Sequence, residues 1–88
     1  MIPTLKDFSK VFGMDLSERS RKTEHVWARF ACYYYLRRKH GMTFIQIGEM
    51  FGYNHAAVIN GVRQFEEKLS INDKLAKSFL EKVHELEL

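Results

Sequence analysis

The sequence predicts an all-α protein of about five helices with a helix-turn-helix at its centre. Apolar residues recur at spacings of three and four in successive segments, whereas alternation of apolar and polar residues never lasts six residues. A connection of about three residues that contains glycine joins two of the helical segments. A chain of 88 residues supports a single hydrophobic core, so residues 1–88 are predicted to form one domain.

The first helix is predicted over residues 3–12, with Pro3 in its first turn and Gly13 ending it. Its apolar face comprises Leu5, Phe8 and Phe12. Residues 14–21 are predicted to be a polar connection.

A second helix is predicted from about residue 22 to 39, with Gly41 ending it. Apolar residues cover most of its circumference, so we expect it to be the central, buried helix. These residues are Val26, Trp27, Phe30, Ala31, Tyr33, Tyr34 and Leu36. Arg29 lies among them, and we expect it either to extend outward to a phosphate or to form an internal ion pair.

The candidate helix-turn-helix comprises two helices near residues 43–51 and 55–69. Thr43 is the expected cap of the first helix, and Asn54 is the expected cap of the second. We place Val58, Val62, Phe65 and Leu69 on the inward face of the second helix, and Ala56, Ala57, Asn60, Arg63 and Gln64 on its outward face.

That outward face suits the major groove of DNA, because no acidic residue precedes Glu66. Alanine side chains allow close approach and can contact thymine methyl groups, and Asn60 and Gln64 can pair with adenine edges. The alternative is an ordinary solvated helix face.

A last amphipathic helix is predicted after Asn72, which we expect to cap it. Its inward residues are predicted to be Leu75, Phe79, Val83 and Leu86. Residues 66–88 hold six acids and four bases, so this end of the chain should point away from DNA. It packs either on the core or on a second copy, and the alternative function is accordingly a non-enzymatic protein–protein interaction module.

The positive charge is concentrated in one part of the sequence. The net charge is +3, but residues 19–39 hold seven bases and one acid. This block, which we expect to form one basic face, favours a polyanionic partner. Arg19, Arg21 and Lys22 are expected to form a flexible basic arm that enters the minor groove, although a solvated charge run is the commoner use of such residues.

Other classes of function are disfavoured. No stretch is long and apolar enough to span a membrane, and the only cysteine, Cys32, excludes an internal disulfide and suits a reducing cytoplasm. No histidine or cysteine spacing is typical of a metal site, and no nucleophile accompanies His55. We therefore expect a non-enzymatic, cytoplasmic and nucleoid-associated protein without a cofactor.

Four short motifs follow one another along the chain. They are Arg19-Ser-Arg21, Ala28-Arg29-Phe-Ala31 with Tyr34, Ile47-Gly48-Glu-Met-Phe51-Gly52, and Asn54-His55-Ala56-Ala57-Val58-Ile59. In this order they resemble the basic loop, the Ala-Arg-Gln-x-Ala-x-Tyr-Leu helix, the Ile-Gly-x-x-Phe-Gly segment and the Asp-His-Thr-Thr-Val-Leu signature of the DnaA family. The similar region is that family's C-terminal DNA-binding domain (domain IV).

The resemblance implies a DnaA domain IV-like, Trp-repressor-like fold that binds double-stranded DNA. It places Arg21 in the minor groove and Arg29 near the major groove. It implies that His55, Ala56 and Ala57 contact the bases and that the start of the first helix of the motif contacts a phosphate. The full set of implied DNA-binding residues is Arg19, Arg21, Lys22, Arg29, Thr43, Phe44, Asn54, His55, Ala56, Ala57, Asn60 and Gln64.

The sequence departs from the family pattern at the turn. Where the family has Gly-Arg-Asp-His, this chain has Tyr53-Asn54-His55, and alanines replace both threonines of the signature. We therefore expect it to read a different DNA sequence. It also lacks a Gly-x-x-x-x-Gly-Lys phosphate loop, so we expect no nucleotide partner and a free-standing regulator or replication accessory, such as one of a phage or mobile element.

Overall fold

The computed structural model describes residues 1–87 and is helical, with no strand among them. The elements are α1 (Leu5–Phe12), α2 (Thr23–His40), α3 (Phe44–Phe51), α4 (His55–Ser70), α5 (Lys74–His84) and a short 3₁₀ helix, η1 (Glu85–Glu87). The predicted all-α class and the two helices of the central motif are confirmed.

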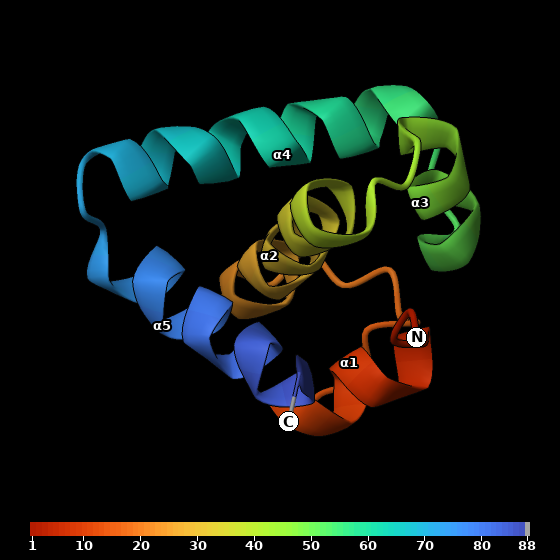
Figure 1. Cartoon of the computed structure of the whole chain (residues 1–88), viewed down its shortest axis with the longest axis horizontal. Coiled ribbons are helices and arrows are strands. Elements are labelled where there is room, and N and C mark those ends of the chain that lie inside the picture. The colour runs from red at the N-terminus through yellow and green to blue at the C-terminus, as the bar shows by residue number, and fades with distance from the viewer. Residues whose placement is uncertain (88) are drawn as a thin grey trace.

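Helix α2 lies at the centre of the molecule, with the other helices arranged around it (Figure 1). It packs against α3, α4 and α5. Its buried side chains are Ala28, Arg29, Ala31, Cys32, Tyr33, Tyr35 and Leu36. The prediction of a central, buried helix is therefore confirmed, although Val26, Trp27, Phe30 and Tyr34 are only partly covered.

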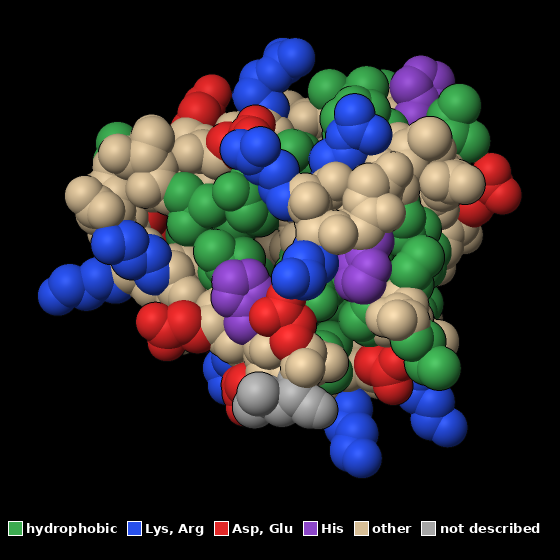
Figure 2. Space-filling model, viewed as in Figure 1, with side chains coloured by type: hydrophobic (Ala, Val, Ile, Leu, Met, Phe, Trp, Pro, Cys, Tyr) green, Lys and Arg blue, Asp and Glu red, His purple; other side chains and the backbone are tan. Residues whose placement is uncertain are grey.

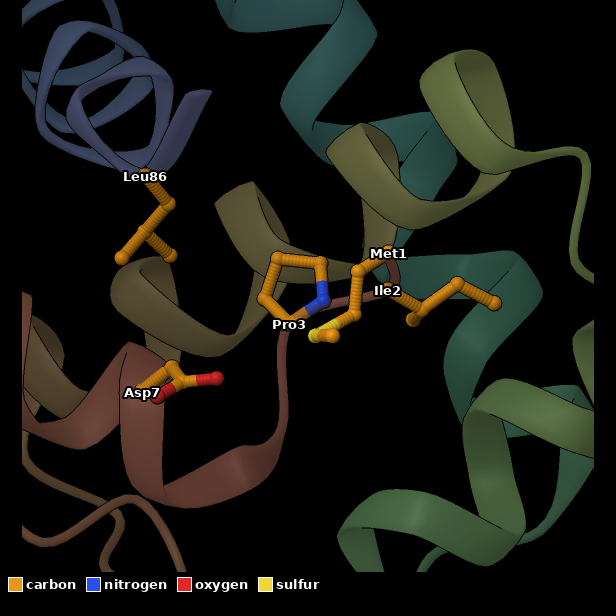
Figure 3. A pocket seen from close by; sticks show the side chains of 5 residues that line it. All are labelled: Met1, Ile2, Pro3, Asp7 and Leu86. Carbon is orange, nitrogen blue, oxygen red and sulfur yellow. The ribbon is translucent and has the colours of Figure 1, made fainter. Parts of the chain in front are cut away.

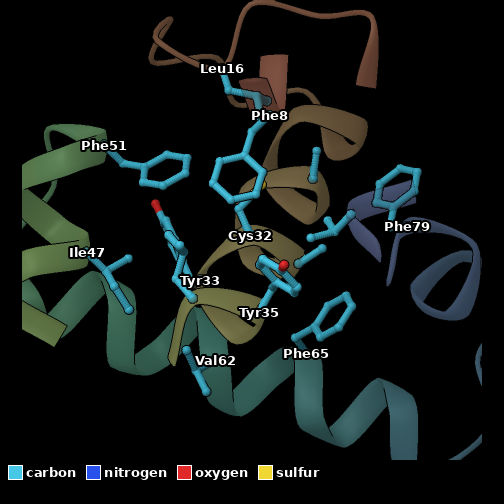
Figure 4. Close-up of a cluster of buried hydrophobic side chains, with 14 of the residues drawn as sticks. Phe8, Leu16, Cys32, Tyr33, Tyr35, Ile47, Phe51, Val62, Phe65 and Phe79 are labelled. Atoms are coloured by element: carbon cyan, nitrogen blue, oxygen red, sulfur yellow. The ribbon is translucent and has the colours of Figure 1, made fainter. Parts of the chain in front are cut away.

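Aromatic rings from separate helices meet in the core (Figure 4). The Phe8 ring of α1 lies edge-on to Tyr35 of α2 at 6.2 Å between ring centroids, and 6.1 Å from Phe51 of α3. Phe51 also packs edge-on to Tyr33 at 5.0 Å. The end of α3 is thereby fixed on the core, which holds the helix-turn-helix in place.

Helix α4 crosses α2 at Gly61, where the two helices approach closely. A Cβ atom at Gly61 would lie 2.6 Å from the Phe30 ring and 3.0 Å from the Tyr33 ring. Because glycine has no side chain, α4 can lie this close to the central helix.

Helix α1 begins later than predicted. Thr4 is its cap, because the Thr4 hydroxyl accepts the Asp7 N–H at 3.2 Å and the Asp7 carboxylate accepts the Thr4 N–H at 2.8 Å. Pro3 therefore precedes the helix instead of standing in its first turn. The predicted end at Gly13 is confirmed.

The connection after α1 is not wholly polar, as it was predicted to be. Leu16 is 1% exposed, and its N–H donates to the Ser9 hydroxyl at 3.0 Å. The connection continues to Lys22, one residue beyond its predicted end, and Leu16 holds it against the core.

Helix α5 differs from its predicted start, while the predicted inward positions of Phe79 and Val83 are confirmed. Its cap is Asp73, whose carboxylate accepts the Ala76 N–H at 2.9 Å, while Asn72 has a left-handed backbone and cannot be the cap. The inward residues are Ala76, Phe79 and Val83, so Leu75 lies one residue off that stripe and is 43% exposed. This face packs on α1, α2 and α4, which answers the question of where the last helix packs.

The two ends of the described chain lie close together. Figure 3 shows the side chains that line a pocket between them, which are Met1, Ile2, Pro3, Asp7 and Leu86. Among residues 1–87, no helix has the length and apolar character needed to cross a membrane.

Candidate nucleic-acid interface

The helix-turn-helix consists of α3, the turn of residues 52–54 and the start of α4. The Thr43 hydroxyl accepts the Gln46 N–H at 3.1 Å, and the Gln46 side-chain oxygen accepts the Thr43 N–H at 2.9 Å. The Asn54 side chain accepts the Ala57 N–H at 2.9 Å. Both predicted helix caps are confirmed, and each satisfies a backbone donor that has no partner within its helix.

The turn between α3 and α4 is tightly packed. Gly52 has a φ of 77°, a left-handed conformation that favours glycine. The Tyr53 N–H donates to the Gly48 carbonyl at 2.9 Å, and a Cβ atom at Gly48 would collide with the Tyr53 carbonyl oxygen. Gly48 and Gly52 together therefore fix the position of α4 relative to α3.

The first two turns of α4 divide into the two faces predicted for them. Val58 and Val62 are buried, whereas His55, Ala56 and Asn60 are exposed and Ala57 is half-buried. Helix N-termini carry a partial positive charge, and α4 has no acidic residue in its first turn. The exposed end of α4 thus carries the small side chains of Ala56 and Ala57 and attracts an anion.

The basic loop before α2 is attached to the turn of the motif. The Arg19 guanidinium donates from Nη2 to the Gly52 carbonyl oxygen and lies over the Tyr53 ring at 4.9 Å from its centroid. Arg19 is therefore a bound residue and not part of a flexible arm, which corrects that expectation. Arg21 and Lys22 follow it and are exposed.

Within residues 1–87, Arg29 neither extends outward nor forms an ion pair, the two arrangements expected for it. It is 6% exposed, and no ion pair within the described residues involves it. Its guanidinium lies over the Tyr53 ring at 5.1 Å, while Nη1 is buried without a hydrogen-bond partner. Burial raises the pKa of the neighbouring Tyr33 hydroxyl, and the Arg29 cation opposes part of that shift.

Arg37 belongs to this region although the sequence interpretation did not assign it a role. Its Nη1 donates to the Met42 carbonyl at 3.1 Å, and its guanidinium lies over the Phe44 ring at 4.6 Å from the centroid. It therefore stands beside the start of α3, where Thr43 and Phe44 lie. The available signal was its position, six residues before the expected cap Thr43.

Six of the predicted site residues fall into two groups. Arg19, Arg29, Asn54 and His55 lie at or beside the turn. Thr43 and Phe44 lie at the opposite end of α3, which is about 12 Å long. A ligand that contacts both groups must therefore be extended.

The basic block of residues 19–39 does not form one continuous face, which corrects that expectation. Arg38 pairs with Glu66 at 3.7 Å, and Lys39 pairs with Glu87 at 3.4 Å. On the face in Figure 2, basic, acidic and apolar side chains are mixed. Within the basic block, the positive charges near the helix-turn-helix are thus those of Arg19, Arg21, Lys22, Arg29 and Arg37.

The histidines and Cys32 do not form a metal site within the part of the chain that the structure describes. No three His, Cys, Asp or Glu side chains there are grouped so that they could hold a metal ion. Cys32 is fully buried, and this burial raises the pKa of its thiol well above the ordinary value.

Comparison with known proteins identifies relatives of this chain. Residues 2–64 match the family model described as the bacterial DnaA protein helix-turn-helix. The chromosomal replication initiator protein DnaA of Mycoplasma pneumoniae is 42% identical over 60 residues, which cover 68% of this chain and 13% of that relative. DnaA of Mycoplasma genitalium is 38% identical over 60 residues, covering 68% of this chain and 14% of the relative.

DnaA 1 of Chlamydia pneumoniae is 33% identical over 54 residues, or 61% of this chain and 12% of the relative. The matches therefore cover only a small part of each of these three relatives. No solved structure matches this chain.

Proposed function

This chain belongs to the bacterial DnaA helix-turn-helix family, and we propose that residues 1–88 form one domain that binds double-stranded DNA with sequence preference. The observation that carries the proposal is the attachment of Arg19 to the Gly52 carbonyl. This contact holds the basic loop beside the start of α4, so one DNA duplex can meet both elements.

The start of α4 is proposed to enter the major groove. His55 and Ala56 are exposed in its first turn, where small side chains and the helix N-terminus allow close approach to the bases. Half-buried Ala57 and exposed Asn60 follow on the same side, and Gln64 lies one turn further on. Alanine methyl groups can contact thymine, and the two amides can contact adenine edges or phosphates.

The basic loop is proposed to reach the adjacent minor groove. Arg21 and Lys22 are exposed, and they follow directly after Arg19, which is held at the turn. An arginine inserted into the minor groove gains from the negative potential there, which is strongest where A·T pairs narrow the groove. Arg21 is therefore the residue expected to favour flanking A·T pairs.

The start of α3 is proposed to contact the DNA backbone. The helix N-terminus, capped by Thr43, presents backbone N–H groups at Phe44, and Arg37 lies over the Phe44 ring. Arg29 adds positive charge from beneath the turn. Together with the loop, these groups could make about four to six phosphate contacts.

The biological role is proposed to be control of replication or transcription, as a non-enzymatic, nucleoid-associated DNA-binding protein. The relatives are chromosomal replication initiator proteins, which favours a role in replication. The finer role that we propose is that of an accessory or regulator, for instance in a phage or mobile element.

A random-oligonucleotide selection followed by a salt titration tests this proposal. We expect an enriched motif, and the logarithm of the association constant should fall with the logarithm of salt concentration at a slope of roughly −4 to −5. The shuffled motif, at the same duplex length, is the control for non-specific attraction. Equal affinity for the selected and shuffled duplexes would refute sequence preference.

A further inference from the structure

We infer that Tyr53 is a positioning residue, whose ring lies between buried Arg29 and exposed Arg19 and holds the Arg19 side chain in the arrangement that DNA meets. This inference rests on the proposed function and concerns one of the residues at which the chain departs from the DnaA pattern. We call Arg19, Arg29 and Tyr53 the arginine–tyrosine cluster.

The cluster joins three segments that are distant in the sequence. Arg19 comes from the basic loop, Arg29 from the central helix and Tyr53 from the turn of the motif. The two guanidinium carbons lie 4.9 and 5.1 Å from the centroid of the same ring. Both distances are within the range of cation–π attraction, for which tyrosine is a suitable partner.

The backbone of Tyr53 is itself fixed. Its N–H donates to the Gly48 carbonyl at 2.9 Å, and its carbonyl oxygen fills the space that a side chain at Gly48 would need. The ring is therefore attached to a rigid turn and not to a mobile loop. A side chain that rests on this ring takes its position from α3 and α4.

Arg19 is exposed and has few other contacts to position it, whereas Arg29 is buried. Arg19 makes one hydrogen bond, to the Gly52 carbonyl, and Arg29 Nη1 has no hydrogen-bond partner in the described structure. Ordering a long side chain at the moment of binding lowers affinity, and a ring that orders it beforehand removes that loss. Loss of the ring should therefore weaken DNA binding about tenfold, as the exposed Arg19 side chain regains its freedom.

The test uses the DNA duplex recovered by selection and the whole 88-residue chain. The variants are Tyr53→Leu, which keeps apolar bulk without an aromatic face, Tyr53→Phe, which keeps the ring, Arg19→Ala, and the double variant of Arg19→Ala with Tyr53→Leu. We expect about a tenfold loss for Tyr53→Leu and recovery of most of it in Tyr53→Phe. The loss in the double variant should be smaller than the product of the two single losses, because both changes release Arg19.

A second measurement, on DNA-free protein, separates this inference from the proposed function. Backbone order of residues 19–22, measured by heteronuclear NMR relaxation, should fall in Tyr53→Leu and stay near the wild-type value in Tyr53→Phe. Thermal melting monitors folding, and Leu75→Ala, which changes an exposed apolar residue on α5, is the control for an apolar substitution elsewhere in the protein.

Three results would overturn the inference. They are unchanged order of the loop in Tyr53→Leu, strictly multiplicative losses in the double variant, and a loss in Tyr53→Phe as large as that in Tyr53→Leu. The last result would show that the hydroxyl contacts DNA directly. If the wild-type chain bound no DNA, the proposed function would fail, and the relaxation measurement would still decide whether Tyr53 orders the loop.

Discussion

A glutamate at residue 56 should stabilise the protein and at the same time impair DNA binding. Ala56 is exposed and is the second residue of α4, so an acidic side chain there would lie beside the positive helix N-terminus. Ala56→Gln is the matched control, because it has nearly the same size and helix propensity without the charge.

The two effects can be given magnitudes. A carboxylate in the first turn of a helix stabilises by about 0.3–1 kcal/mol, which corresponds to roughly 2–6 °C in the melting temperature of a domain this small. In the complex, a carboxylate about 6 Å from one phosphate is repelled by about 1–3 kcal/mol, depending on the local dielectric constant. We therefore expect affinity at least fivefold lower for Ala56→Glu than for Ala56→Gln.

Thermal melting by circular dichroism measures the first effect, and fluorescence anisotropy with a labelled duplex at 0.1 M salt measures the second. Ser78→Glu on the exposed side of α5 adds the same charge far from the motif and should bind like wild type. Equal affinities of Ala56→Glu and Ala56→Gln would refute the placement of α4 against DNA. A melting temperature of Ala56→Glu below that of Ala56→Gln would refute the electrostatic argument for the helix start.

Four further outcomes are expected. Arg21→Ala should lower affinity for all duplexes and reduce the salt slope by about one, with relaxed preference for flanking A·T pairs, as a salt titration on two duplexes would show. Gly48→Ala should lower the unfolding free energy by about 1 kcal/mol in urea titrations, because overpacking against the Tyr53 carbonyl exceeds the gain in helix propensity; a more stable variant would contradict this packing. Hydrogen bonds from Thr4 lower the pKa of Asp7 below its ordinary value of 3.8, so its contribution to stability is present above that pH and is lost as the pH falls through the lowered pKa; stability measured between pH 2 and 5 should depend less on pH in Asp7→Asn. Cys32, fully buried with a raised thiol pKa, should react with a disulfide reagent only at the rate of unfolding, and rapid reaction of the native protein would contradict its burial.

The sequence was sufficient to predict the helices and the caps that start the central motif. Thr43 and Asn54 act through hydrogen bonds to residues three positions away, so their role follows from local sequence. The cap of α5 was misassigned because Asn72 and Asp73 are both good caps, and only the left-handed backbone of Asn72 distinguishes them. Phe79 and Val83 are buried as predicted, whereas at the first turn Ala76 takes the inward place expected for Leu75.

The candidate site was less predictable, because its contacts join distant segments. Arg19 meets Gly52 across 33 positions of the sequence, and Arg29 meets Tyr53 across the packing of α2 on α3. No periodic pattern encodes such contacts. The charge of the basic block was evident, but its division between the motif and the ion pairs of Arg38 and Lys39 depends on how the helices pack.

The burial of Phe65 shows that the segment matched by the family model is shorter than the segment that forms the core. The family match ends at residue 64, within α4, and the next residue, Phe65, is completely buried. Phe79 of α5 lies edge-on to Phe12 of α1 at 5.2 Å, so the helix after the match closes the core around the first helix. A fragment trimmed to the matched residues would keep every group proposed to contact DNA, yet we expect it to bind hydrophobic dyes and aggregate. Similarity thus covers the surface proposed to contact DNA, whereas side chains that complete the core, such as Phe79 and Val83, lie beyond it in α5.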